Sequence, residues 1–431
     1  MALERINISD GITLNIIKTD KFKTNYLSFN FVCNLSEKSA SLNALIPQVL
    51  IRGTKKHPDM ASLKIALDEL YAASVEARVY KRGEFQVVGM SASWLDDKFS
   101  IDGTDITLGT LDVLEEVLFD PYTENGVFAK SYVEGEKPNL IDEIRAAINN
   151  KTSYAINRCR EEMCKNEPYG ISVYGTEDQV EKITPEGLYN AYTELLKTSR
   201  IEIFYVGGND TCKMAQRIRD MFKNAEREYK APTPAVVIND VSSVKEVTEK
   251  CQATQGKLSL GFRNGCYLGD SDYKAFPLFV EIYGGSPVSK LFMNVREKLS
   301  LCYYCRAIPE GLKGIMVVTS GIEVENKQKT QNEIIDQLES IKNGNITEEE
   351  IALAKKSLKN AYNELEDNPA SLESWYVTRR LANLDDTPNE VIEGILEVTK
   401  DEIVEAAKKI KLDTVYFLEG TLKGEEVSDD E

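Results

Sequence analysis

The chain has 431 residues, too many for one ordinary hydrophobic core, and its 42% hydrophobic and 28% charged residues are typical of a globular protein. Its formal net charge of −18 excludes the basic surface that a nucleic-acid partner or an anionic membrane would require. His57 is the only histidine, so the chain alone lacks the two or three imidazoles that a catalytic zinc site normally uses.

Targeting signals and cysteine usage indicate the compartment. The N-terminus has no apolar segment followed by a small-residue cleavage site, so we expect no signal peptide. No run approaches the ~18–20 apolar residues of a membrane span. The eight cysteines are scattered along the chain, which is more typical of free thiols than of a disulfide framework. We therefore expect a cytoplasmic protein without a membrane partner.

The first half of the chain predicts a sheet combined with helices. Residues 26–33 form a β-like run and lead to an apolar helix at residues 44–53. Residues 85–92 alternate between two faces, which is typical of a half-buried strand. Thr184, which is followed by a proline, marks the start of a later helix, and an apolar strand follows at residues 203–207.

The second half repeats this order, which is the strongest organisational signal in the sequence. A strand at residues 257–262 precedes an apolar helix at residues 275–284, and residues 314–321 form an alternating strand. Thr399, with a glutamate three residues later, has the spacing of a capping box and precedes a final strand at residues 415–419. The chain therefore contains an internal duplication.

The duplication predicts an α+β fold of two homologous domains, each a mainly antiparallel sheet covered by helices. We place the N-terminal domain at residues 1–228 and the C-terminal domain at residues 246–424. Residues 229–245, which contain two prolines, are interpreted as an extended linker. The acidic tail at residues 425–431 is expected to be disordered.

The duplicated plan, with an apolar helix that runs into a Gly-Thr pair at residues 53–54, resembles the insulinase/pitrilysin metallopeptidases. Active members carry a His-x-x-Glu-His motif on this helix, in which two histidines bind zinc and the glutamate activates water. The corresponding positions here hold Ala44, Pro47 and Gln48. Alanine has no donor atom, proline cannot act as a base, and glutamine is a poor zinc ligand.

The remaining candidates for a zinc site do not replace these residues. Glu143 lies about where the family keeps its distal zinc-ligand glutamate, but one carboxylate cannot hold a catalytic zinc, so we interpret it as a remnant on a helix surface. His57 could be a displaced ligand, but a solvated loop histidine beside two lysines is the better interpretation, because no second imidazole exists. We expect this chain to bind no cofactor.

The second half is closer to the family pattern. Residues 283–304 are similar to the Arg/Tyr segment, in which a helix ending in Arg-Glu-Lys leads to a strand with tyrosine. The match places Arg296 as the arginine and Tyr303 as the tyrosine, with Tyr304 one position beyond. The resemblance implies that a partner's zinc site receives these side chains, the guanidinium to bind substrate and the hydroxyl to stabilise an oxyanion.

Each of these residues also has an ordinary structural interpretation. Arg296 could complement a helix dipole, and Tyr303 could pack in a sheet. Cys302 and Cys305 have the spacing of a zinc-ribbon or redox pair, but no second pair exists and two such side chains on a strand would point to opposite faces. We therefore interpret the two cysteines as packing residues, and Arg296 and Tyr303, which match the family together, as functional.

The resemblance spans essentially the whole chain and is closest to short, two-domain members that work as pairs, among them subunits associated with the 5-aminopentanol modification of elongation factor P. It implies a catalytically inactive subunit that forms half of a clamshell with a homologous, zinc-bearing partner carrying His-x-x-Glu-His, and that acts on a peptide or small protein. The alternatives are a non-enzymatic scaffold or peptide-binding protein of the same fold, and an enzyme with unusual ligands.

Overall fold

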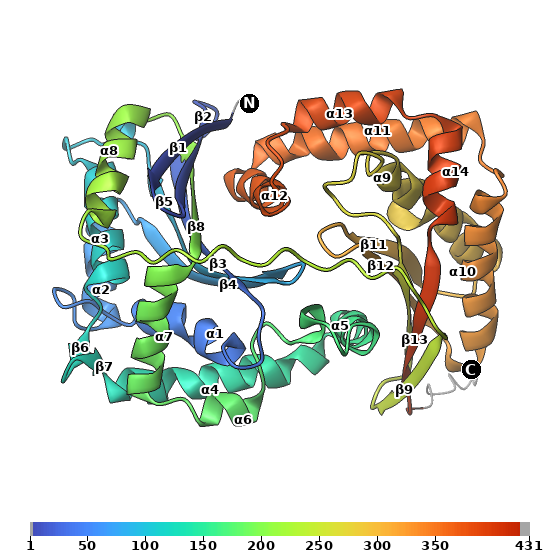
Figure 1. Ribbon diagram of the computed structural model, residues 1–431, viewed down its shortest axis with the longest axis horizontal. Helices are drawn as coiled ribbons and strands as arrows, with labels where there is room; N and C mark the ends of the chain where they lie inside the picture. The colour runs from blue at the N-terminus through green and yellow to red at the C-terminus, as the bar shows by residue number, and fades with distance from the viewer. Residues whose placement is uncertain (1–2, 423–431) are drawn as a thin grey trace, which may run out of the picture. The chain divides into compact units, whose positions relative to one another are not determined.

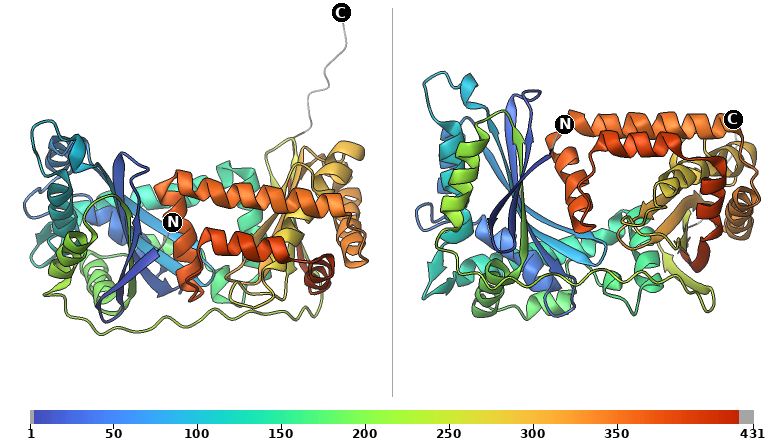
Figure 2. Two further views of the ribbon diagram at one scale, coloured as in Figure 1. Left: turned by 90° about the horizontal axis from the view of Figure 1, so that it is seen from above. Right: turned by 45° about the horizontal axis from the view of Figure 1, so that its top comes forward.

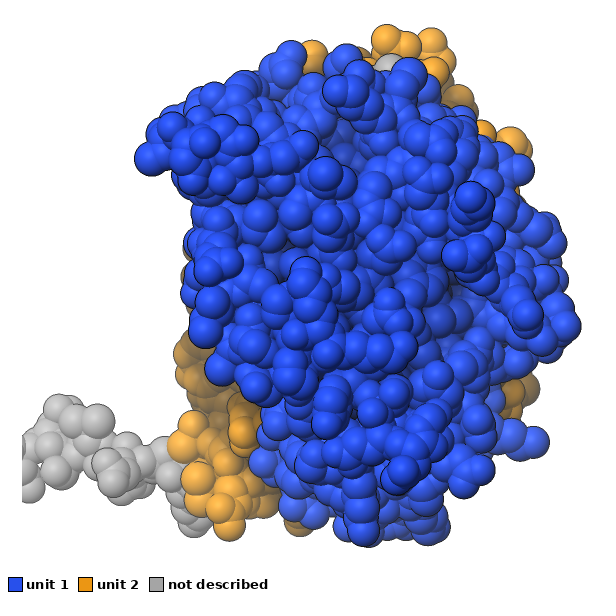
Figure 3. Space-filling model, turned by 90° about the vertical axis from the view of Figure 1, so that its left-hand side faces the viewer, with its two compact units in different colours: residues 1–145, 171–234, 365–380 blue, residues 146–170, 235–364, 381–431 orange. Residues whose placement is uncertain are grey.

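The computed structural model describes residues 3–422, and the acidic tail at residues 425–431 lies outside this part of the chain. The chain divides into two compact units (Figure 1, Figure 3). Unit 1, blue in Figure 3, comprises residues 1–145, 171–234 and 365–380, and unit 2, orange, comprises residues 146–170, 235–364 and 381–431. Each unit therefore takes one segment from the other half of the sequence.

Unit 1 contains a six-stranded sheet in the order β1-β2-β8-β3-β5-β4. Only β2 and β8 pair in parallel, and every other pair in this sheet is antiparallel. A short hairpin of β6 and β7 lies apart from it. The strands are β1 (Leu3–Ser9), β2 (Ile12–Lys18), β3 (Thr24–Asn34), β4 (Ser74–Arg82), β5 (Phe85–Leu95), β6 (Thr123–Glu124), β7 (Val127–Phe128) and β8 (Arg200–Gly207).

Unit 2 contains a five-stranded sheet in the order β11-β12-β10-β13-β9, again with one parallel pair, β13 with β9. This order and these directions reproduce β4-β5-β3-β8-β2 of unit 1, so the internal duplication predicted from the sequence is present in the two sheets. The strands are β9 (Lys245–Cys251), β10 (Gly256–Arg263), β11 (Tyr304–Glu310), β12 (Ile315–Ile322) and β13 (Lys411–Gly420).

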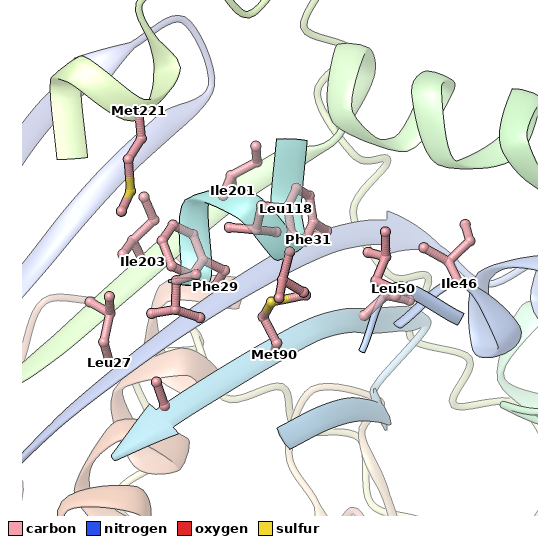
Figure 4. Close-up of a cluster of buried hydrophobic side chains, with 14 of the residues drawn as sticks. Leu27, Phe29, Phe31, Ile46, Leu50, Met90, Leu118, Ile201, Ile203 and Met221 are labelled. Carbon is pink, nitrogen blue, oxygen red and sulfur yellow. The ribbon is translucent and has the colours of Figure 1, made fainter. Parts of the chain in front are cut away.

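The core of unit 1 follows from the alternation of side chains along β3. Leu27, Phe29 and Phe31 point to the face covered by helices and pack with residues of the neighbouring elements (Figure 4). Ser28 and Asn30 point to the opposite face, yet they are also buried. Both faces of this strand are therefore covered.

Most helices of unit 1 begin at a side-chain cap. Thr184 caps α7 with Pro185 at the first position, as predicted. The helices are α1 (Ala40–Leu50), α2 (Met60–Glu69), α3 (Ile106–Phe119), α4 (Lys130–Ala146), α6 (Glu177–Glu181), α7 (Pro185–Thr198) and α8 (Thr211–Phe222). A further helix, α12 (Pro369–Leu381), covers the polar face of the sheet, where Glu373 accepts hydrogen bonds from Ser28 and Asn30.

In unit 2, α11 and α13 lie side by side (Figure 2) and the predicted capping box of Thr399 and Glu402 begins α14. The other face of the sheet is covered by α5, whose Ala155, Ile156 and Cys159 pack on strand residues. The helices are α5 (Lys151–Met163), α9 (Ala275–Val280), α10 (Lys327–Lys342), α11 (Glu348–Glu364), α13 (Pro388–Glu397) and α14 (Lys400–Lys408), with two π-helical segments, η4 (Glu281–Gly285) and η5 (Leu291–Lys298).

The predicted α+β class, with open sheets covered by helices, is confirmed. The two compact units also differ from a simple division into residues 1–228 and 246–424. Helix α5, from the first half of the sequence, belongs to unit 2, and α12, from the second half, belongs almost entirely to unit 1. Among residues 3–422, no helix combines the length and apolar character needed to cross a bilayer.

Candidate functional site

The degenerate motif positions lie on α1, a buried helix. Ala44 and Gln48 are four residues apart and so share one face of this helix. Both line a cavity in unit 1, whereas Pro47 is buried inside the helix and is not among the lining residues. Glu143, on α4, lines the same cavity. The fold thus brings together three of the four positions that the resemblance assigned to a zinc site.

The cavity has a volume of ≈ 550 Å³. Its charged residues are mostly neutralised: the buried Glu136 accepts from Arg52 at 2.9 Å, and Arg78 pairs with Glu373 at 3.1 Å. Glu143 is exposed. The lining residues are Ala44, Gln48, Ala77, Arg78, Val79, Tyr80, Glu136, Asn139, Leu140, Glu143 and Tyr174. Burial raises the pKa of Tyr174, and the negative charge of Glu143 raises it further.

This donor set does not fit a catalytic zinc ion. Of the motif positions, Ala44 and Pro47 offer no side-chain donor, and Gln48 offers only a neutral amide. Glu143 is then the only anionic ligand among the four positions. The motif positions of this cavity therefore cannot activate a water molecule by the chemistry of the active peptidases that the chain resembles.

The second candidate segment is built on unusual backbone. Residues 291–298 (η5) form a π-helix. This conformation is rare in proteins, and where it occurs it often lies at a functional site. The chain leaves this helix through Ser300, which has a φ of 49°. Gly284, in the preceding π-helical segment, lies close to the backbone of β11. Any side chain there would clash, since a Cβ would lie 2.9 Å from the backbone nitrogen of Ala307.

Arg296 and Tyr303 both lie at the surface of unit 2. The Arg296 side chain is 42% exposed, stacks on Phe292 at 4.6 Å and approaches Glu297 at 3.4 Å. Tyr303 is 53% exposed, lies one residue before β11 and donates its hydroxyl proton to Glu323. The hydrogen bond and the charge of Glu323 raise the pKa of Tyr303. Neither side chain is part of the hydrophobic core.

Tyr304 has different surroundings. Its side chain is half-buried, and its hydroxyl lies 3.0 Å from the Oγ1 of Thr152 on α5. The ammonium of Lys257 lies 5.6 Å from the centre of its ring. Tyr304 therefore ties the start of β11 to α5, and of the two tyrosines only Tyr303 is presented to solvent. Neither Thr152 nor Glu323 was indicated by the sequence.

Comparisons with known proteins show the family. A family model described as the peptidase M16 inactive domain matches residues 182–358. The probable inactive metalloprotease YmfF of Bacillus subtilis (strain 168) is 37% identical over 415 residues, which cover 95% of this chain and 96% of that protein. The chain belongs to the M16 peptidase family. The resemblance to the insulinase/pitrilysin peptidases is thereby confirmed, and with its motif positions altered this chain is an inactive M16 homologue.

Two solved structures support the same M16 fold. A conserved protein from Enterococcus faecalis V583 superposes with a TM-score of 0.89 at 28% identity, covering 99% of this chain and 100% of that one. A peptidase M16 inactive domain from Pseudomonas fluorescens superposes with a TM-score of 0.79 at 16% identity, again covering 99% and 100%. At 16% identity the second likeness shows the fold alone.

The structure corrects two expectations, one about Cys302 and Cys305 and one about His57. Both cysteines pack against the hydrophobic core of unit 2, as interpreted, but the expectation that they point to opposite faces of a strand was wrong, because Cys302 precedes β11 and its thiol interacts with that of Cys305. His57 is not a solvated loop residue: its side chain is 18% exposed and its Nε2 lies 3.6 Å from Glu116. The chain bends at His57 and at Tyr303, so the neighbours of these side chains differ from those that the sequence suggested.

If the cavity keeps the geometry of an M16 zinc site, three substitutions should restore metal binding. We expect the variant Ala44→His, Pro47→Glu, Gln48→His to bind about one zinc ion per chain, because two imidazoles four apart on α1 then face Glu143. Metal analysis after dialysis measures this. The same variant with Glu143→Ala is the control and should bind zinc more weakly; a folded triple variant without zinc would contradict the prediction.

Proposed function

We propose that this chain is the non-catalytic subunit of a heterodimeric, cytoplasmic zinc metallopeptidase and supplies Arg296 and Tyr303 to the active site of a zinc-bearing M16 partner. The observation that carries the proposal is that this chain has lost the zinc-binding residues of the family but keeps its Arg/Tyr pair. The motif positions on α1 hold no zinc-ligand set, whereas Arg296, on the π-helix η5, and Tyr303, just before β11, both have exposed side chains.

The two side chains suit complementary tasks. A guanidinium donates paired hydrogen bonds to carbonyl or carboxylate oxygens, so Arg296 would hold the peptide substrate. A tyrosine hydroxyl is protonated at neutral pH, so that of Tyr303 can donate to a developing oxyanion. Glu323 accepts the Tyr303 proton in the isolated chain. Substrate would take the place of this carboxylate as the acceptor.

The proposal assigns the remaining chemistry to the partner. A homologue with His-x-x-Glu-His would hold the zinc ion and activate the water molecule. This chain would bind and orient a peptide or small protein.

The test is the double variant Arg296→Ala, Tyr303→Phe in the reconstituted pair. Removing one oxyanion donor costs on the order of 10²-fold in rate, so we expect kcat/KM for a reporter peptide to fall at least that far. Arg306→Ala, which removes an exposed arginine from the same strand region, is the matched control and should leave the rate unchanged. Co-elution on size exclusion shows that each variant still binds the partner.

An unchanged rate in the double variant, with the complex intact, would reject the proposed role. The non-enzymatic alternative would then be favoured, in which this M16 chain binds peptides or assembles a complex. The alternative also predicts co-purification with proteins unrelated to M16 peptidases, whereas the proposal predicts co-purification with a homologue that carries the zinc motif.

A further inference from the structure

Two free thiols flank the tyrosines of the Arg/Tyr segment. Cys305 lies on β11 directly opposite Ser320 of β12, and its side chain is part of the buried core of unit 2. Cys302, three residues earlier, packs against the same hydrophobic cluster and is half-buried. The chain bends at Tyr303 between them. Both thiols therefore lie on the core side of the segment while Tyr303 is exposed.

The two thiols differ in a way that suits redox chemistry. A hydrogen bond from Cys305 lowers the pKa of the Cys302 thiol against the opposing effect of burial, and Ser320 and the charge of Arg296 lower it further. The same hydrogen bond, together with burial, raises the pKa of the Cys305 thiol. A more accessible, more acidic thiol beside a buried one is the arrangement of an attacking and a resolving cysteine.

We propose that Cys302 and Cys305 are a dithiol site that low-molecular-weight disulfides oxidise to an intrachain disulfide. The Cys302 thiolate attacks one sulfur of the small disulfide, forms a mixed disulfide and releases one small thiolate, which takes up a proton. Cys305 then loses its proton, attacks the sulfur of Cys302 and releases the second small thiol. The protein loses two electrons and two protons, and the small disulfide becomes two thiols.

Closure of this disulfide changes the segment between the two cysteines. A disulfide requires Cα atoms about 4.4–6.8 Å apart. Because Cys302 precedes β11 and Cys305 lies on it, closure would tighten the bend at Tyr303 and pull Tyr304 from its position opposite Gly321 at the start of β11. The same movement would take the Tyr303 hydroxyl away from Glu323. If the proposed function holds, oxidation therefore switches off the contribution of this chain to the partner.

The experiment uses the full chain, first reduced and then treated with oxidised glutathione. We expect the intact mass to fall by two hydrogen atoms, and peptide mapping to place the loss on the peptide that holds residues 302–305. Cys305→Ser should instead keep a glutathione adduct on Cys302, and Cys302→Ser should form neither product in this segment. Exposed Cys212 is the internal control: its thiol is expected to form a glutathione adduct, and no other cysteine lies near it in the sequence.

The mass readout needs no partner, so it can fail separately from the proposed function. Glutathione adducts on Cys212 while Cys302 and Cys305 stay unmodified would overturn the proposal. So would a stable adduct on Cys302 of the native chain that never resolves. In the reconstituted pair, we expect oxidation to lower the peptidase rate on the order of 10²-fold, as for loss of Tyr303. An oxidised pair with an unchanged rate would overturn the switch alone.

Discussion

Replacing Glu167 by glutamine should lower the free energy of unfolding of unit 2 by about 3–5 kcal/mol. Glu167 follows α5, and its carboxylate pairs with Arg263 and Lys313, each at 2.5 Å. The side chains of these two cations are 4% and 0% exposed. Asp413 lies 3.1 Å from Arg263 and keeps one carboxylate beside it. The variant nevertheless removes from two buried cations a carboxylate that lies at hydrogen-bond distance from both, in a region of low dielectric, which is the reason for the large loss.

Urea denaturation followed by far-UV circular dichroism measures the loss at Glu167. Glu405→Gln is the matched control, because Glu405 pairs with Lys408 at 2.7 Å while both side chains are more than half exposed. Exposed pairs contribute about 0–1 kcal/mol, so this control should change the unfolding midpoint little. Equal effects of the two substitutions would show that the buried network does not hold α5 on the sheet.

The same residue predicts a pH dependence. Burial raises the pKa of Glu167, but the hydrogen bonds from Arg263 and Lys313 outweigh it and hold the pKa below its ordinary value of 4.5. The stability that this carboxylate provides is therefore complete above pH 4.5 and is lost as the pH falls through the lowered value in the folded protein. The difference in the free energy of unfolding between the native chain and Glu167→Gln should be constant near neutral pH. It should become smaller in acid.

Replacing Glu373 by alanine should destabilise unit 1 by a similar amount, about 3–5 kcal/mol. Glu373 lies on α12, its side chain is fully buried, and it accepts two hydrogen bonds at 3.1 Å from Arg78. Ser28 and Asn30 donate to it at 2.9 and 3.0 Å. The substitution removes the carboxylate from a largely buried guanidinium and the acceptor from two buried polar groups, each of which is costly.

Tryptophan fluorescence can follow this unfolding selectively, because the only two tryptophans, Trp94 and Trp375, both belong to unit 1. Asp367→Ala is the control: it removes an exposed pair with Lys21 close to the start of α12. We expect the Glu373 variant to shift the fluorescence midpoint strongly and the Asp367 variant to shift it little. A Glu373→Ala midpoint equal to that of the native chain would contradict a stabilising role for this ion pair.

The sequence by itself determined the repeated plan and the loss of the zinc motif. Alternating strands and threonine caps depend on local spacing, so they could be recognised without contacts between distant residues. The absence of donor atoms at Ala44 and Pro47 needs no structure, because no fold can supply a side-chain ligand there. The Arg/Tyr segment was recognised from residue types at fixed spacing in the same way.

Only the tertiary structure decided how the two halves share their helices. Ser28 and Asn30 alternate with apolar residues and would be expected to face water, yet α12 buries them. Arg78 and Glu373 lie 295 positions apart, and no local pattern pairs two such residues. Likewise, Cys302 approaches Cys305 only because the chain bends at a residue that reads as strand. Whether a polar side chain is buried depends on which distant residues the fold packs against it. The periodicity of a sequence shows only on which face of its own helix or strand a residue lies.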